Sequence, residues 1–320
     1  MNTQIKLAII AIAIVIPLAS LAITQTNSTS NNSTNENSKL QVVASATFLY
    51  EFSQNIGKEM IDVTLLVPMG ADPHDWEPTI RDTERLQKAD MIIVNGIGYE
   101  HWLNSLELSD IAGILVDTSN GISTLDSANH DEEKHDDHAK EDGHDDEDNH
   151  NHGVLDPHIW LNPVFAQLQV KNIANALSNS DPTNKNYYQS NAAIYNQKLN
   201  LLDTKIRTEL SGCKTDFITF HDAFSYFSEE YGLTQHTIIS STDSHGDVTP
   251  KTLEHIISLA RELNIKVIFA EENTSTKTSQ VIAHEIGGKV LVLSPLEIIS
   301  DETYVEKMTQ NLESLKDALC

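Results

Sequence analysis

The chain has 320 residues with 47 acidic against 21 basic side chains, which gives a formal net charge of −26. This charge argues against nucleic-acid binding, because there is no basic surplus to displace counterions from phosphates. With 39% hydrophobic residues, the chain is long enough for one large domain or two lobes with packed cores.

The amino-terminal segment is typical of an exported protein. An uncharged run, LAIIAIAIVIPLASLAIT, follows Lys6. At the start of a chain such a run is either a signal-peptide core or a short membrane anchor, and we assign residues 1–24 to it. A Ser/Thr/Asn-rich tether, residues 25–40, follows and is expected to be disordered. We therefore expect an extracytoplasmic protein, located at the cell surface or in a periplasm-like space.

Short apolar runs alternate with helical patterns in both halves of the chain. The expected strands are 41–47, 61–67, 91–95 and 113–117 in the first half, and 216–220, 237–240, 267–270 and 289–293 in the second. The expected helices include 79–90, 250–263, 275–287 and 302–319. Strands separated by helices of this length predict βαβ units and mainly parallel sheets.

A long helical segment separates the two halves. Asn162 and Pro163 are typical of a helix start, and they open a helix expected at 164–177. Residues 184–210 contain no Gly or Pro, and their apolar side chains recur every three or four positions. This pattern predicts one amphipathic helix, roughly 40 Å long at 1.5 Å per residue.

The predicted fold class is therefore α/β, with two (β/α) lobes whose parallel sheets are joined by one long rigid helix. The expected parts are an amino-terminal lobe, the linking helix and a carboxyl-terminal lobe, at residues 41–182, 183–211 and 212–320.

Three histidines lie at predicted turns. ADPHDWEP and LDPHIWLNP share an Asp-Pro-His-x-Trp pattern, and FITFHDAF places a histidine directly after an expected strand. Proline excludes a helix running into the histidine, and rigid turns at strand ends are where α/β folds place ligand-binding groups. One such histidine is more often a hydrogen-bonding loop residue. Three on matching turns, His74, His158 and His221, favour a tetrahedral zinc site.

Other residues have two open interpretations. Asp72 and Asp156 either orient the neighbouring imidazoles or cap their turns. Cys213 and Cys320 are an even pair in an exported chain, which is compatible with one disulfide, although two unrelated cysteines would look the same.

Taken together, these motifs resemble the zinc-specific cluster A-I metal-binding solute receptors of ABC importers. The resemblance covers residues 41–320 and includes the DPHxWEPT turn, RLQKADMIIVNGIGYE, DPHIWLNP, FHDAFSYFSEEYGL, TPKTLEHII and VIFAEENTS. It implies a metal site in the cleft between the lobes, with His74, His158 and His221 as ligands. It also implies a monomeric binding protein without catalysis, which delivers Zn²⁺ to an ABC transporter permease in the membrane.

The resemblance leaves the fourth ligand open. Histidine at the third position favours Zn²⁺ over Mn²⁺, which prefers carboxylates. The family often has Asp where this chain has Ser294, and a neutral serine is a poor zinc ligand. Glu297, Glu271 or water are the alternatives.

Two other kinds of function compete with a zinc receptor. A zinc hydrolase also uses three histidines with an open fourth position, but no H-E-x-x-H helix is present. A manganese or iron receptor, or an adhesin, is the alternative within the same family.

A histidine- and acid-rich loop, residues 129–152, interrupts the first lobe. Its core, HDEEKHDDHAKEDGHDDEDNHNH, contains six of the fourteen histidines. The sequence predicts no turn or strand that would hold them at fixed distances, so a primary site here would lose ordering entropy for each ligand. We interpret the loop as a disordered, weaker accessory that gathers Zn²⁺ near the cleft, and a solvated charge run is the alternative.

Deleting residues 130–152 should therefore leave one tight zinc site and remove any weaker ones. Isothermal titration of the metal-stripped chain with Zn²⁺ checks this, and loss of the tight site would overturn the assignment.

Overall fold

The computed structural model describes residues 39–68, 71, 73–106, 111–125, 155–239, 248–272, 276–298 and 301–320. The predicted export segment, almost the whole tether, Asp72 and the histidine-rich loop lie outside this part. The segment Leu40–Cys320 clusters as one unit. Within the described residues, no helix has both the length and the apolar character needed to cross a membrane.

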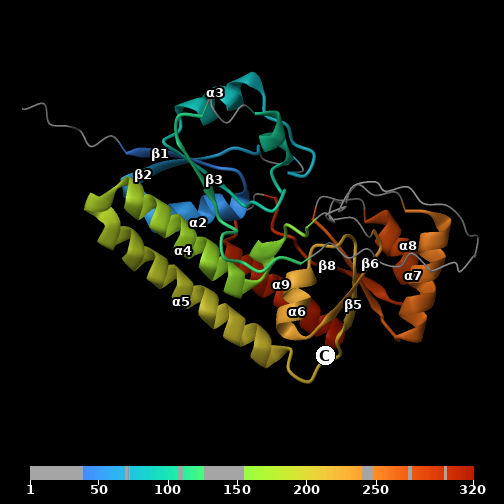
Figure 1. Ribbon diagram of the computed structural model, residues 1–320. Coiled ribbons are helices and arrows are strands. Elements are labelled where there is room, and N and C mark those ends of the chain that lie inside the picture. The colour runs from blue at the N-terminus through green and yellow to red at the C-terminus, as the bar shows by residue number, and fades with distance from the viewer. Residues whose placement is uncertain are drawn as a thin grey trace, which may run out of the picture. The chain divides into compact units, whose positions relative to one another are not determined.

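The first sheet is parallel and is covered by helices on both faces (Figure 1). Its strands are β1 (Leu40–Ala44), β2 (Ile61–Leu65), β3 (Met91–Val94) and β4 (Ile114–Asp117), in the order β2-β1-β3-β4. Successive side chains of a strand point to opposite faces. Val42 and Ile93 therefore pack toward α2 (Thr47–Gly57), whereas Val43 and Ile92 lie in a separate cluster with Leu86 of α3 (Ile80–Lys88). Burial on both faces explains why β3, a central strand, is continuously apolar, whereas the edge strands β2 and β4 are partly exposed.

The second sheet repeats this plan. Its strands are β5 (Asp216–Thr219), β6 (Thr234–Thr237), β7 (Val267–Ala270) and β8 (Lys289–Val292), in the order β6-β5-β7-β8. Phe217 and Phe269 face α9 (Tyr304–Leu319), whereas Ile218 and Ile268 pack with α7 (Pro250–Glu262) and α8 (Lys277–Glu285). The two parallel sheets confirm the predicted fold class.

Two strand predictions need correction. β1 ends at Ala44, and Thr47, expected as its last residue, begins α2. β6 lies at 234–237 instead of 237–240. Ile238 and Ile239 made the later segment look like the strand, because both side chains are buried in the core. They lie just beyond β6, where their amides still donate to the carbonyls of Thr219 and Phe220 at 3.0 and 2.8 Å.

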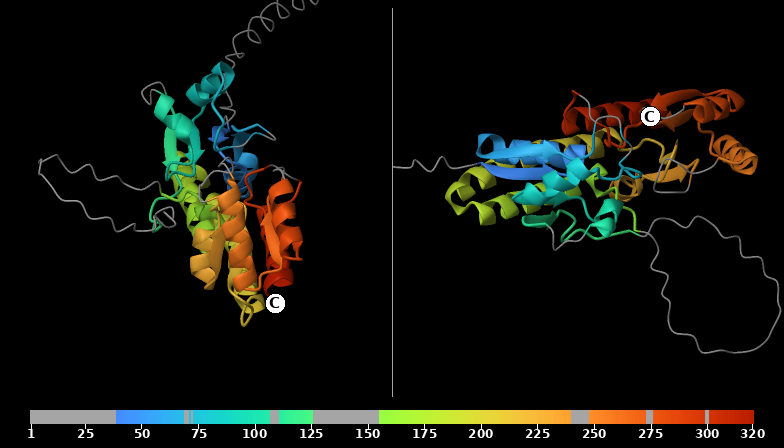
Figure 2. Two further views of the ribbon diagram at one scale, coloured as in Figure 1. Left: turned by 90° about the vertical axis from the view of Figure 1, so that its right-hand side faces the viewer. Right: turned by 90° about the horizontal axis from the view of Figure 1, so that it is seen from above.

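Two neighbouring helices follow the first sheet in the chain, and the second of them connects the lobes. In α4 (Pro163–Ser180), Asn162 Oδ1 accepts a hydrogen bond from the amide of Val164 at 2.9 Å, which confirms the predicted cap. α5 (Lys185–Glu209) is the predicted long helix, and it extends from beneath the first sheet to the second lobe (Figures 1 and 2). Its buried side chains are Tyr188, Asn191, Ala192, Tyr195, Leu199, Leu202 and Ile206. One hydrophobic cluster runs from the first sheet through α5 to α9.

Short elements complete the described fold. They are α6 (Ser225–Tyr231) and the 3-10 turns Lys58–Met60, His101–Ser105, Ile159–Leu161 and Pro182–Asn184.

A disulfide fixes the carboxyl-terminal residue beside the end of α5. Cys213 and Cys320 are bonded, and the amide of Lys214 donates to the carbonyl of Leu319 at 3.0 Å. The structure therefore confirms the pairing that the sequence left open. The bond closes a loop with a sequence separation of 107.

Replacing both cysteines, by Cys213→Ser and Cys320→Ser, should lower the free energy of unfolding by about 2–4 kcal/mol, because the unfolded chain regains the freedom of a long loop. Denaturant titration with and without a reductant measures this. The double variant should not respond to the reductant, and equal stability of the variant and the oxidised parent would contradict the prediction.

Candidate metal centre

Four potential metal-binding side chains come from four separate connections of the fold. His74 lies in the loop after β2, and His158 immediately precedes the 3-10 turn that leads into α4. His221 follows β5, and Glu297 lies in the loop after β8. The carboxyl ends of parallel strands meet at one edge of each sheet, which is where α/β folds bind ligands. The structure thus brings together all three histidines singled out from the sequence.

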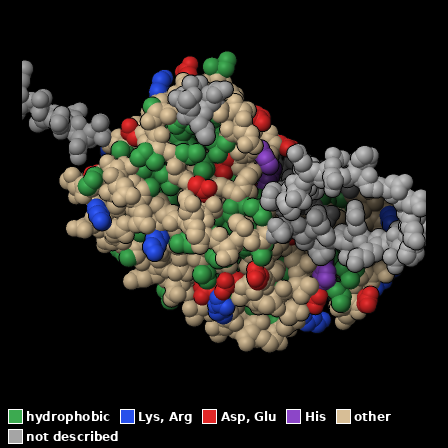
Figure 3. Space-filling view, in the orientation of Figure 1, with side chains coloured by type: hydrophobic (Ala, Val, Ile, Leu, Met, Phe, Trp, Pro, Cys, Tyr) green, Lys and Arg blue, Asp and Glu red, His purple; other side chains and the backbone are tan. Residues whose placement is uncertain are grey.

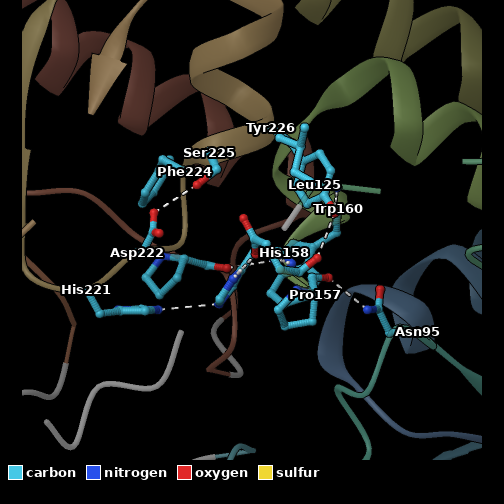
Figure 4. A network of polar contacts seen from close by, with 12 residues as sticks. Asn95, Leu125, Pro157, His158, Trp160, His221, Asp222, Phe224, Ser225 and Tyr226 are labelled. Carbon is cyan, nitrogen blue, oxygen red and sulfur yellow. Dashed lines mark hydrogen bonds and ion pairs between the residues drawn. The ribbon is translucent and has the colours of Figure 1, made fainter. Parts of the chain in front are cut away.

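The four side chains converge on one point. One donor atom from each, at His74, His158, His221 and Glu297, lies within 4.8 Å of all the others. Glu297 Oε1 is 2.9 Å from His74 Nε2 and 3.4 Å from His158 Nε2. His158 Nε2 and His221 Nε2 are 3.4 Å apart and point toward each other (Figure 4). Zinc–nitrogen bonds of about 2.0–2.1 Å place two tetrahedral ligands about 3.3–3.4 Å apart, so this donor set fits zinc.

Carboxylates fix two of the imidazole rings. Asp156 Oδ1 is 2.7 Å from His158 Nδ1 and accepts the amide of His158 at 2.9 Å. Glu271 does the same for His221, because its Oε1 contacts His221 Nδ1 and accepts the His221 amide. A carboxylate on Nδ1 holds the proton there and leaves Nε2 free to bind a metal. Asp156 therefore orients an imidazole, which is one of the two interpretations that the sequence left open, while the role of Asp72 stays a prediction.

The structure separates the residues that were candidates for the fourth metal ligand. Glu271, one of the expected alternatives, lies on the far ring nitrogen of His221 and serves to orient it. Ser294 donates its hydroxyl to Glu272 Oε2 at 3.0 Å. Of the two acids, Glu297 is the one that lies against the Nε2 atoms of His74 and His158, and its side chain is only 7% exposed. That these four residues hold a metal stays a prediction.

The charges within the cluster depend on one another. Burial lowers the pKa of His158, but Asp156 and Glu297 raise it more, to about 10. Burial raises the pKa of Glu297, but His74 and His158 hold it well below its usual range. Without a metal, the cluster therefore keeps a proton on an imidazole beside a charged carboxylate. A bound cation would take over that proton's electrostatic role.

The fold and the cluster define a class of protein. Two α/β lobes with parallel sheets are joined by one long helix, and a buried ligand cluster lies where the lobes meet. This is the architecture of solute-binding receptors of ABC importers. The chain belongs to the family described as zinc-uptake complex component A, periplasmic, whose model matches residues 42–318.

Individual relatives agree with this membership. The chain is 41% identical over 293 residues to the high-affinity zinc uptake system protein ZnuA of Bacillus subtilis, and the match covers 89% of each protein. It is 32% identical over 287 residues to the zinc-binding protein AdcA of Streptococcus pyogenes. That match covers 87% of this chain and 56% of AdcA, so the chain spans little more than half of that relative.

Solved structures share the fold. The metal-dependent lipoprotein YcdH of Bacillus subtilis is 38% identical with a TM-score of 0.72, and the match covers 88% of this chain and 99% of YcdH. A mutant of the laminin-binding adhesin Lmb of Streptococcus agalactiae is 28% identical with a TM-score of 0.76, covering 88% and 100%.

The turn that carries His158 is held from both lobes by residues that the sequence did not single out. Asn95, just after β3, donates its side-chain amide to the carbonyl of Pro157 at 2.9 Å (Figure 4). Tyr226 of α6 donates its hydroxyl to the carbonyl of Asp156 at 2.7 Å. Asn95 and Tyr226 lie far from this turn in the sequence, so no local pattern could reveal them.

A buried acid supports Asn95 in turn. Glu100 accepts hydrogen bonds from the hydroxyl of Ser45 and from the amides of Asn95 and Gly96, at 2.6, 2.7 and 3.0 Å. Burial raises the pKa of Glu100 to about 7. Its charge is therefore costly in the folded chain, although three donors compensate part of the cost.

Glu100 should make the metal-free chain less stable as the pH rises. Its folded-state pKa exceeds its ordinary value of 4.5, so the stabilisation is complete below pH 4.5 and is lost as the pH rises through about 7. The loss amounts to about 3 kcal/mol. Glu100→Gln does not titrate, so the variant should gain about that much relative to the parent between these pH values. Denaturant titrations across the pH range measure the difference.

Glu262→Gln is the matched control, because Glu262 is exposed on α7 and its replacement should leave the pH profile unchanged. Parallel pH profiles for the parent and Glu100→Gln would contradict the prediction.

Proposed function

We propose that this chain binds Zn²⁺ outside the cytoplasm with His74, His158, His221 and Glu297, and delivers it to an ABC transporter permease. The observation that carries the proposal is the convergence of four buried donor atoms within 4.8 Å of one another. Burying unpaired charges and imidazoles is costly, and a bound cation relieves that cost. The family description and the names of the relatives support the same function.

The donor set favours zinc over manganese. Three imidazole nitrogens and one carboxylate oxygen suit Zn²⁺, whereas Mn²⁺ prefers sites richer in oxygen. A manganese or iron receptor is therefore the weaker alternative.

The site also gives a means of capture and release. His74 and His158 belong to the connections of the first lobe, and His221 and Glu297 to those of the second. A permease that separates the lobes slightly would break the donor set and release the ion. Because α5 is a continuous helix packed in the shared core, we expect this motion to be small.

The cellular setting follows the same proposal. The family is described as periplasmic and the related YcdH as a lipoprotein, which supports an extracytoplasmic, membrane-tethered receptor. All four donors come from one chain, which favours a monomer. On the face seen in Figure 3, the described lysine and arginine side chains lie singly and form no continuous basic patch, which is unsuited to a nucleic-acid partner.

A zinc hydrolase is the less favoured function. Catalytic zinc sites keep one coordination position open for water. Here Glu297 contacts both His74 and His158, so its carboxylate is placed to fill that position. The arrangement is better suited to holding an ion than to activating water on it.

Removing one ligand should abolish tight binding. In isothermal titration the metal-stripped parent should show one tight zinc site. His158→Ala should weaken it by more than the roughly 10–100-fold that loss of an outer hydrogen-bond partner costs, and Asp156→Asn should fall within that range. His284→Ala is the matched control, because the His284 side chain is 88% exposed. Absence of zinc binding by the stripped parent would disprove the proposed function.

A further inference from the structure

The loop that carries Glu297 belongs to the second lobe, but residues of the first lobe hold it. Trp160 Nε1 donates a hydrogen bond to the carbonyl of Pro295 at 2.8 Å. Thr47 Oγ1 donates to the next carbonyl, that of Leu296, at 2.9 Å. The two residues immediately before Glu297 are thus each tied to the other lobe.

The backbone of this loop needs such ties. Leu296 has a φ of 62°, in the left-handed region that disfavours residues with a side chain by roughly 1–2 kcal/mol. Its side chain is buried in the core shared by the two lobes. This turn places Glu297 next to the histidines, so the carboxylate depends on a conformation that the chain would not readily adopt alone.

Trp160 is itself rigidly held next to the metal centre. Its ring stacks on Phe48 with centroids 4.4 Å apart, and its carbonyl accepts the hydroxyl of Tyr304 at 2.6 Å. Its ring centroid is 5.1 Å from that of His158, two residues earlier in the same turn. Trp160 therefore links the turn of His158 directly to the loop of Glu297.

Thr47 supplies a second fixed donor. It is the first residue of α2, whose side chains Phe48 and Phe52 are buried in the shared core. Its position is thus set by the packing of the first lobe and not by the loop that it contacts.

We infer that Trp160 and Thr47 are positioning residues for the fourth ligand: they hold the Glu297 carboxylate against the three histidines and make its place depend on contact between the lobes. This inference rests on the proposed function. When the lobes separate, both hydrogen bonds break, the loop can relax, and the carboxylate leaves the cluster. The Glu297 carboxylate therefore binds the ion only while the two lobes are in contact.

The test is a double-mutant cycle on zinc affinity. Trp160→Phe and Thr47→Val remove the donors while preserving an aromatic ring and a branched side chain. Each should weaken zinc binding about 10–100-fold, as loss of an outer hydrogen-bond partner does. If they act through Glu297, the weakening should largely disappear in a Glu297→Gln background, because coupled residues are not additive.

A metal-free measurement complements the cycle. Hydrogen–deuterium exchange of residues 294–298 should become faster in Trp160→Phe and Thr47→Val, and the free energy of unfolding of each variant separates this from global destabilisation. The matched control is Thr309→Val, which loses a 2.7 Å hydrogen bond within α9. This control should leave exchange and zinc affinity unchanged.

The outcomes distinguish the positioning role of Trp160 and Thr47 from the proposed zinc-binding function. Unchanged zinc affinity in Trp160→Phe and Thr47→Val, or the same loss in the Glu297→Gln background, would overturn the positioning role while zinc binding by the parent stands. If the parent binds no zinc, the proposed function fails. Unchanged exchange at 294–298 would then overturn the anchoring of the loop as well.

Discussion

The burial of one carboxylate among three imidazoles is the constraint on which the rest of this structure depends. Such groups leave water only when their donors and acceptors are satisfied. Here carboxylates contact both sides of the imidazoles. Asp156 and Glu271 contact the Nδ1 atoms of His158 and His221, and Glu297 contacts Nε2 of His74. These three acids come from three different connections of the fold, so the sheets, the helices and the joint between the lobes must all be in place at once.

Sequence reasoning succeeded where the determining physics is local. Apolar runs predicted seven of the eight strands at or near their positions, and the uninterrupted periodicity predicted α5. His74 and His158 were found because proline makes their turns rigid, and Asp156 because it lies two residues from the ring that it orients. The one misplaced strand, β6, shows the limit, since buried residues just beyond a strand look the same as residues within it.

The sequence could not decide between Glu271 and Glu297 as the proposed fourth ligand, because the contacts that place Glu297 come from residues far away in the chain. Thr47 and Leu296 are separated by 249 positions, and Trp160 and Pro295 by 135. Nothing near Glu297 in the sequence signals a left-handed residue before it or a donor from the other lobe. Glu271 was an equally reasonable candidate by composition. The difference between the two acids is which imidazole nitrogen each one meets, and that is decided only by tertiary packing.

The hydrophobic cluster that passes from the first sheet through α5 to α9 also has a consequence for how the chain acquires its structure. Neither lobe has a complete core of its own, because each one buries part of its apolar surface against helices that the other also uses. A fragment containing only one sheet would expose that surface to water. Each lobe should therefore need the other to reach its stably packed state, and any opening between the lobes would deform this shared interior instead of rotating two independent bodies.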